Sequence, residues 1–328
     1  MWARLLIVAF LSYLLLGCGK DAPSNPKGIK GRIVGTGNVG KTQAIVLIHG
    51  LENYGELEEM RTKLASDFSN AIVVDLNRTN SNTSSISQQA EDAFKELQRL
   101  NIVDKEIILI GDSQGGLLGW ELYDSYKDQL KVKLLITNHT PWEGAPLAKA
   151  TVEIIERIKS ELRLFGNVLG TTMEKLLFGK MFGQSVSIGS GVTDLIPNSS
   201  YLQKVRSNLL HAEIPIVAIG GTIDAISGFA ILVDLNPEGI KVQMRLYGVD
   251  LNTVNNIIEP IFSEIIGHQE NDAVIPLDSQ LAKNIPTNDQ FRRETINDYH
   301  HFASIMEEPA YPLIVKTIKD VFQPVKTN

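Results

Sequence analysis

The chain has 328 residues, 43% of them hydrophobic, so it is long enough to bury a sizeable core. Its formal net charge is only −7 and it contains no long basic run, which argues against nucleic acid as a partner. Cys18 is the only cysteine, which excludes a disulfide bond within the chain.

The N-terminal residues predict the cellular location of the protein. One charge, Arg4, precedes a leucine-rich run that is too short for a comfortable membrane span, so we interpret residues 1–17 as a signal peptide. The run ends in Leu-Leu-Gly-Cys, which resembles the lipobox of bacterial lipoproteins, and this resemblance implies lipidation of Cys18. We therefore expect an extracytoplasmic, lipid-anchored protein of the bacterial cell envelope, at the outer membrane because Gly19 gives no retention signal. A transmembrane anchor with an incidental cysteine is the alternative.

After the anchor, the sequence predicts a tether and one domain. Residues 18–30 contain two prolines and two glycines and are typical of a flexible tether. Strand and helix patterns alternate along 31–328, which predicts an α/β fold with a mostly parallel sheet and helices on both faces. The predicted strands cover 44–48, 70–76, 107–110, 132–137 and 214–220, and the predicted helices cover 57–68, 86–100 and 114–126.

A possible nucleotide motif occurs early in the domain. Residues 35–42 match the P-loop pattern G-x-x-x-x-G-K-[ST]. That motif requires a helix directly after it, because the N–H groups of the helix N-terminus hold the phosphates. A β-type run follows instead at 44–48, so we interpret 35–42 as a glycine-rich hairpin turn and expect no nucleotide.

The strongest chemical signal is the pentapeptide Gly-Asp-Ser-Gln-Gly at 111–115. It follows the apolar strand predicted over 107–110 and precedes a predicted helix, which is the context that a nucleophilic serine needs. On such a sharp turn the neighbouring positions have little room for side chains, and glycines occupy them. Ser113 is therefore the candidate nucleophile.

With the His49-Gly50 turn after strand 44–48, this pentapeptide resembles the α/β-hydrolase fold, and within it the bacterial lipases and esterases. The resemblance implies an oxyanion hole built from the backbone N–H groups of Leu51 and Gln114. It leaves the His49 imidazole a structural part of the turn.

Two insertions are expected in this fold. The Thr-Pro-Trp-Glu-Gly segment that ends at Gly144 resembles a turn of lipases, in which Trp142 either lines the acyl pocket or packs as a core aromatic. The alternation then breaks off over about 145–211, where Asp-Leu-Ile-Pro-Asn-Ser resembles a segment of lipase caps, so we expect a helical cap. A second insertion covers about 225–267 and has no predicted place.

A serine hydroxyl needs a base within hydrogen-bond reach and a carboxylate that fixes the tautomer of that base. In this fold the acid follows the serine in the chain and the histidine follows the acid. Residues 271–276 resemble the Asn-Asp-x-Val-Val-Pro turn of lipases, which implies Asp272 as the acid and Val-Ile-Pro as the edge of the last strand. Asp224 is the alternative acid, or otherwise a helix N-cap. The His-Phe ending of the family implies His301 as the base, with His300 as its competitor.

These motifs predict a serine hydrolase that cleaves carboxylic esters, expected to be lipid acyl esters, through an acyl-enzyme. An acyltransferase or thioesterase with the same triad is one alternative, and a non-catalytic binding protein of the envelope is another. We expect no cofactor and no metal, because no histidine and carboxylate cluster has metal-ligand spacing. The histidines interpreted as structural are His139, His211 and His268.

Overall fold

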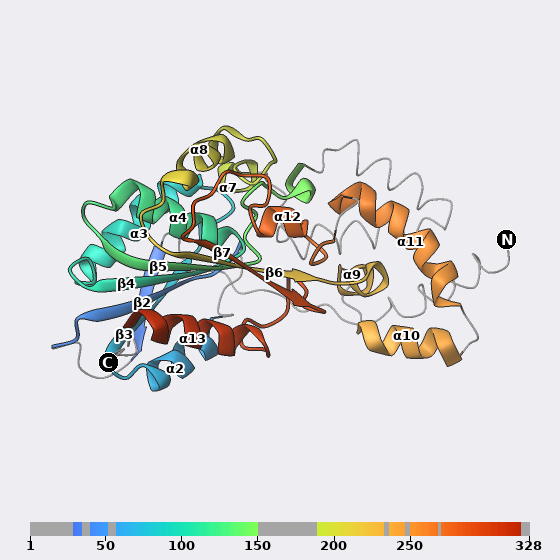
Figure 1. Ribbon diagram of the computed structural model, residues 1–328, viewed down its shortest axis with the longest axis horizontal. Helices are drawn as coiled ribbons and strands as arrows, with labels where there is room; N and C mark the ends of the chain where they lie inside the picture. Colours follow the sequence, from blue (N-terminus) through green and yellow to red (C-terminus); the bar gives the residue numbers. More distant parts are fainter. Residues whose placement is uncertain are drawn as a thin grey trace.

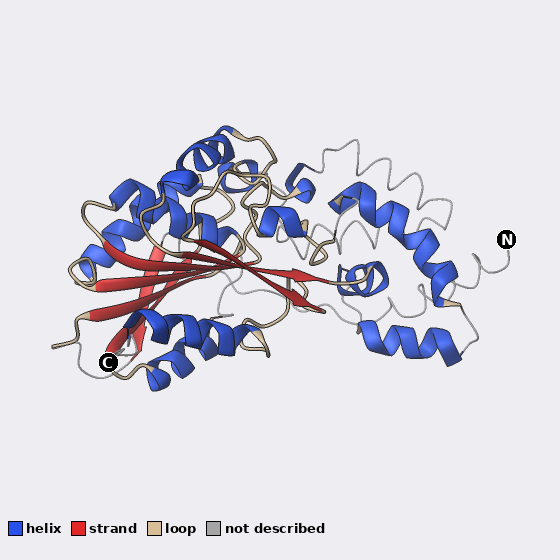
Figure 2. Ribbon diagram, in the orientation of Figure 1, coloured by secondary structure: helices blue, strands red, loops and turns tan. Residues whose placement is uncertain are grey.

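The structure is a computed structural model in which residues 29–34, 40–51, 57–149, 189–232, 236–246, 250–267 and 270–322 are described. Within them, seven strands form one sheet in the order β1-β3-β2-β4-β5-β6-β7. Figure 2 shows the strands in red with helices on both sides. β1 pairs antiparallel with β3, and all the other neighbouring strands are parallel. The strands are Ile29–Val34 (β1), Gln43–Ile48 (β2), Ala71–Arg78 (β3), Glu106–Asp112 (β4), Lys131–Asn138 (β5), Ile216–Thr222 (β6) and Phe291–Asn297 (β7).

Helices cover both faces of the sheet, so its central strands are apolar on both sides. In β2, the side chains of Ala44, Val46 and Ile48 pack with α3 and α4, whereas Ile45 and Leu47 pack with α2 and α13. The two helix layers lie on opposite sides of the sheet in Figure 1. These helices are Glu58–Asp67 (α2), Ile86–Arg99 (α3), Gln114–Tyr126 (α4) and Ala310–Phe322 (α13).

The described part of the predicted cap packs on the α4 side of the sheet. Tyr201, on α8, is buried and donates its hydroxyl hydrogen to the carbonyl oxygen of Leu117 on α4 at 3.0 Å. Residues 150–188, which hold most of the predicted cap, lie outside the described residues. The described elements here are Pro146–Lys149 (η1), Ser190–Thr193 (α7), Ser200–Asn208 (α8) and Leu209–His211 (η2).

The second insertion is a helical lobe beyond the carboxyl end of β6 (Figure 1). Ile226 and Ala230 of its first helix pack on Val254 of its third helix as a small cluster separate from the two main ones. The helices of the lobe are Ala225–Leu232 (α9), Pro237–Leu246 (α10) and Leu251–Ile266 (α11), and the short Leu277–Gln280 (α12) follows them.

Three expectations differ from the structure. The strands on either side of residues 35–42, β1 and β2, do not pair as a hairpin, because β3 lies between them in the sheet. Residues 35–39 themselves lie outside the described residues. Val274–Pro276 do not form the last strand: they belong to a turn closed by the bridge between Asn271 and Pro276, and the last strand is β7. β1 also begins at Ile29, two residues inside the range predicted for the tether.

Candidate active site

Ser113 occupies a strained turn between β4 and α4. Its backbone angles are φ +50° and ψ −123°, a region that non-glycine residues rarely adopt. A Cβ atom on Gly111 would overlap the backbone of Gly115 and Gly116, and one on Gly115 would overlap the carbonyl oxygen of Ile48. The glycines therefore allow the close approach of β2, β4 and α4 that holds the Ser113 hydroxyl at the carboxyl edge of the sheet.

A hydrogen-bond series joins Ser113 to two residues that are distant in the sequence. Nε2 of His301 lies 3.1 Å from Oγ of Ser113, and Nδ1 of His301 lies 2.8 Å from Oδ2 of Asp272. The backbone N–H of His301 also donates to the carbonyl oxygen of Asp272 at 2.8 Å, which ties the two loops together. With Nδ1–H donating to the carboxylate, Nε2 is left to accept the serine proton.

Asp272 is fully buried but surrounded by donors. Its Oδ1 accepts hydrogen bonds from the backbone N–H groups of Val274 at 2.9 Å and Ile275 at 2.7 Å. Burial opposes ionisation, but the adjacent His301 and the hydrogen bonds from His139 and His301 together hold the pKa of Asp272 well below its usual value. The carboxyl is therefore ionised at neutral pH.

The His49-Gly50 turn lies beside Ser113, since a Cβ atom on Gly50 would come within 3.0 Å of the serine Cβ. Nδ1 of His49 contacts the Gly50 carbonyl oxygen at 2.7 Å, and Nε2 accepts the backbone N–H of Arg78 at 2.9 Å. Burial, helped by the Arg78 charge, lowers the pKa of His49 to about 3. This imidazole is therefore neutral and supports the turn.

Gln114 begins α4, so its backbone N–H has no acceptor within the helix. Its buried amide joins α4 to the neighbouring loops, since Nε2 donates to the carbonyl oxygens of Ser81 at 3.0 Å and Gly191 at 2.8 Å. Arg78 donates to Oε1 of Gln114 at 3.0 Å and to the carbonyl oxygens of His49 and Gly50. One buried guanidinium thus connects both segments of the predicted oxyanion hole, at Leu51 and Gln114.

Comparison with known proteins gives a partial match to one family and a shared fold. The sequence model of the palmitoyl protein thioesterase family matches residues 44–206, which include the His-Gly turn and the serine but end before the acid and the histidine. Among solved structures, a mature lipase from Bacillus licheniformis is 14% identical, with 90% of this chain and 99% of that chain covered, at a TM-score of 0.51. The chain has the α/β-hydrolase fold. No curated protein matches it.

Two further solved structures are similar to this chain at lower TM-scores. A thermophilic esterase from Thermogutta terrifontis is 15% identical, covering 89% of this chain and 92% of that chain, at a TM-score of 0.48. A carboxylesterase structure from Nitrososphaera gargenis is 14% identical, covering 92% and 98%, at a TM-score of 0.49. At 14% identity, the likeness to the Bacillus licheniformis lipase shows the shared fold alone.

Three residues that the sequence offered as alternatives for the site have other roles in the structure. Asp224 accepts hydrogen bonds from the backbone N–H and the hydroxyl of Ser227 and pairs with Lys241 at 2.8 Å, so it caps α9. His300 is half-buried, which lowers its pKa, and it is His301 that contacts Ser113. Trp142 is fully buried against Trp120 and Phe291, which favours the core-packing alternative for this residue.

The structure also adds two residues that the sequence analysis did not connect with the site. Nδ1 of His139 lies 2.8 Å from Oδ2 of Asp272. The carboxyl of Asp112 is buried, which raises its pKa, and it accepts a hydrogen bond from Asn138 at 2.7 Å. Their positions in the sequence could have indicated this role. Asp112 and His139 each stand at the carboxyl end of a parallel strand, and parallel sheets carry their functional sites at that edge.

Among the described residues, His139, Asp272 and His301 form the one group whose donor atoms are close enough to share an ion, all within 4.8 Å of one another. Both imidazoles, however, already contact the same carboxylate oxygen at 2.8 Å. We therefore interpret the group as a hydrogen-bonded network.

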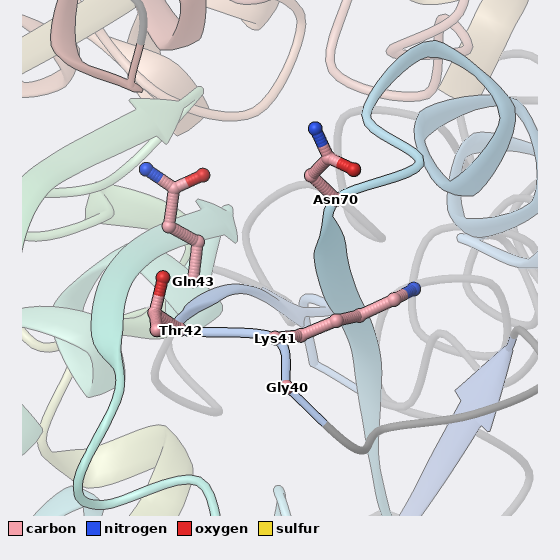
Figure 3. Close-up of a pocket in the computed structure, with 5 residues that line it drawn as sticks. All are labelled: Gly40, Lys41, Thr42, Gln43 and Asn70. Atoms are coloured by element: carbon pink, nitrogen blue, oxygen red, sulfur yellow. The ribbon is translucent and has the colours of Figure 1, made fainter.

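The remainder of the P-loop pattern lies at the opposite edge of the sheet. Gly40, Lys41, Thr42, Gln43 and Asn70 line an open hollow of about 550 Å³ at the beginnings of β2 and β3 (Figure 3). Nζ of Lys41 donates to the carbonyl oxygen of Ala71 at 3.1 Å. β2 starts at Gln43 directly after the pattern, so the helix that a phosphate site requires is absent at this point of the described chain.

Cys18 and His268 lie outside the described residues, so the proposed lipidation site has no structural description. In the part of the chain that the structure describes, no helix combines the length and the apolar composition needed to cross a bilayer.

Proposed function

We propose that this α/β-hydrolase is a serine hydrolase that cleaves acyl esters or thioesters. The observation that carries the proposal is the series of contacts from the Ser113 hydroxyl through His301 to Asp272, at 3.1 and 2.8 Å. Ser113 is the nucleophile, His301 is the general base, and Asp272 fixes the tautomer of the imidazole and stabilises the imidazolium that forms.

In the proposed reaction, Oγ of Ser113 attacks the acyl carbonyl carbon while Nε2 of His301 takes the hydroxyl proton. The carbonyl oxygen becomes an oxyanion and accepts hydrogen bonds from the backbone N–H groups of Leu51 and Gln114. His301 then protonates the leaving alcohol or thiol, and an acyl-enzyme remains on Ser113. Water, deprotonated by His301, releases the carboxylic acid and restores the serine.

We propose a long acyl chain as the group that is transferred to Ser113. The similarity of residues 44–206 to the palmitoyl protein thioesterase family and the fold shared with a lipase support this substrate class. Each buried methylene contributes about 0.8 kcal/mol, so an apolar pocket would favour chains of eight or more carbons by a large factor over acetyl.

Hydrolysis of a thioester is a second candidate, favoured by that family match. The mechanism is the same for both bonds, because only the leaving atom changes from oxygen to sulfur. An acyltransferase that uses this triad would pass the acyl group from Ser113 to an alcohol, an amine or a thiol instead of to water.

The test is covalent labelling of the purified protein with a fluorophosphonate, followed by assays with palmitoyl-CoA and with p-nitrophenyl esters of increasing chain length. We expect the label on Ser113 and a preference for long chains. Ser113→Ala should lose the label and about 10⁴-fold or more in kcat. The matched control is Ser207→Ala, on the α8 surface, which should keep both.

A protein that takes no label would contradict the mechanism itself. Strict specificity for acetyl esters would contradict the lipid substrate but leave the mechanism intact. Faster release of the acyl group when an alcohol is added, with the ester as product, would favour the acyltransferase.

We also propose that Cys18 carries a lipid anchor that holds the domain on the bacterial envelope, which supports access to lipid esters. Expression of the full chain in a Gram-negative host should place it in the outer-membrane fraction, with a diacylglyceryl mass on a mature N-terminus at Cys18. Cys18→Ser should move the protein out of that fraction, and an unchanged distribution would contradict the anchor.

A further inference from the structure

A second imidazole contacts the carboxylate that orients His301. His139 directly follows β5, and its Nδ1 lies 2.8 Å from Oδ2 of Asp272, the same oxygen that His301 contacts. The same nitrogen is also 3.2 Å from Oε1 of Gln280. That amide oxygen already accepts the backbone N–H of Gly221 at 2.7 Å, so Asp272 is the closer acceptor and Gln280 a weaker one.

The protonation of His139 follows from what surrounds its two ring nitrogens. Nε2 of His139 is buried and has no hydrogen-bond partner among the described residues. A carboxylate only accepts hydrogen bonds, so the imidazole nitrogen that contacts Asp272 is the one that must carry a proton. The proton therefore belongs on Nδ1, where it is donated to Asp272.

The backbone and the packing hold His139 in place. The residue has φ +49°, a left-handed conformation that non-glycine residues seldom adopt, and its side chain is fully buried. Its ring stacks on Tyr299 at a centroid distance of 4.5 Å. A Cβ atom on Gly221 would come within 2.7 Å of Cε1 of His139. A strained backbone that aims a buried imidazole at an acid points to a role for that imidazole.

All the acceptor positions of Asp272 are used when His139 is counted. Oδ1 accepts from the N–H groups of Val274 and Ile275, and Oδ2 accepts from His139 and His301. A carboxylate offers about four lone-pair positions, so the fourth donor completes the set.

We propose that His139 is a positioning residue that shares Oδ2 of Asp272 with His301 and thereby sets the basicity of His301. This inference rests on the proposed function. A shared oxygen presents less negative charge to His301 than an unshared one, so the imidazolium of His301 is stabilised less and loses its proton at a lower pH. His139 thus keeps His301 unprotonated in mildly acidic conditions, and it also fixes the orientation of the Asp272 carboxylate.

Other titratable groups face this network and stay the same when residue 139 is changed. Asp112 at the end of β4 interacts with both His139 and His301, and His300 interacts with Asp272 and with the two other histidines. Glu307 also interacts with His300. Apart from the base His301 itself, His139 is the donor to Oδ2 that a substitution can remove, so the experiment is made at residue 139.

The experiment compares His139→Asn with His139→Leu in the full chain. The two side chains have nearly the same shape, but only the Asn amide can donate to Asp272, and Asn also tolerates a positive φ. His139→Gly is the second non-donor, and it accepts the backbone conformation without strain. For each variant, the rate of fluorophosphonate labelling at Ser113 and kcat/KM are measured against pH.

We expect the acidic limb of both profiles to move to higher pH by about half a unit or more in the Leu and Gly variants, and to return toward the wild-type position in the Asn variant. A purely structural role would lower the rates without moving the limb. Limbs that coincide in wild type and in the Leu and Gly variants would overturn the inference, while labelling at Ser113 would keep the proposed function intact. Wild-type protein that takes no label at Ser113 would overturn both.

Discussion

At the scale of single residues, the site depends on which of two aspartates meets the imidazole. Both follow the serine in the sequence, and both stand in loops at the carboxyl edge of the sheet. Asp272 is fully buried beside His301 at 2.8 Å, whereas Asp224 caps α9 and pairs with Lys241. The two residues therefore form a matched pair for substitution.

We expect Asp272→Asn to lower kcat about 10³- to 10⁴-fold, because an amide stabilises the wrong tautomer of His301 and does not stabilise its imidazolium. Asp224→Asn should leave kcat within about threefold of wild type and lower the free energy of unfolding by less than about 1 kcal/mol, because Asn is also a good N-cap. Steady-state kinetics and urea unfolding of both variants check this. Comparable losses of kcat in the two variants would contradict the assignment of the acid.

The residues of the site differ in how far the sequence could reveal them. Ser113, Asp272 and His301 stand in short motifs, and the structure brings these three side chains together. His139 and Arg78 stand in no motif that carries chemistry. Their contacts with Asp272 and with the His49-Gly50 turn depend on the packing of loops that follow different strands, so only the folded chain reveals them.

At the scale of elements, the local hydrophobic pattern predicts helices and strands correctly where the element is regular and buried. The helix expected over 114–126 agrees with α4, and the strand expected over 132–137 lies within β5. The period-2 and period-3.6 patterns are strong there, because one or both faces of each element are apolar.

The predictions that differ concern pairing and irregular segments. The glycines of residues 35–42 favoured a hairpin before β2. Instead β1 pairs with β3, which follows β2 in the sequence. Val274 and Ile275 look like a strand because they are β-branched, yet their N–H groups donate to the Asp272 carboxylate instead of to a ladder. A side chain that accepts backbone hydrogen bonds in this way competes with strand formation.

At the scale of the whole molecule, a buried histidine links stability to pH. The pKa of His49 is about 3 in the folded protein, chiefly because of burial, against about 6.5 for an exposed histidine. Between these values the unfolded chain binds more protons than the folded chain, so stability is lost as the pH falls below about 6.5. The lowered pKa of His300 acts in the same direction.

We therefore expect the free energy of unfolding to fall by about 2 kcal/mol between pH 7 and pH 5 from His49 alone. Urea unfolding at the two pH values measures it. His49→Asn, whose amide can still donate to the Gly50 carbonyl oxygen, should flatten the dependence by about that amount. Equal slopes in wild type and variant would contradict the neutral, buried state of His49.

The α/β class and the serine turn could be predicted without coordinates, because they depend on local steric and periodic constraints that neighbouring residues express. The order of serine, acid and histidine came from the resemblance to a known fold. Coordinates were needed to show that His301 contacts Ser113 and that His139 contacts Asp272. They were also needed to show that Asp224 caps a helix and that residues 225–267 form a helical lobe. Those outcomes depend on the order of the strands, which brings the ends of distant segments to one edge of the sheet, and no local pattern records that order.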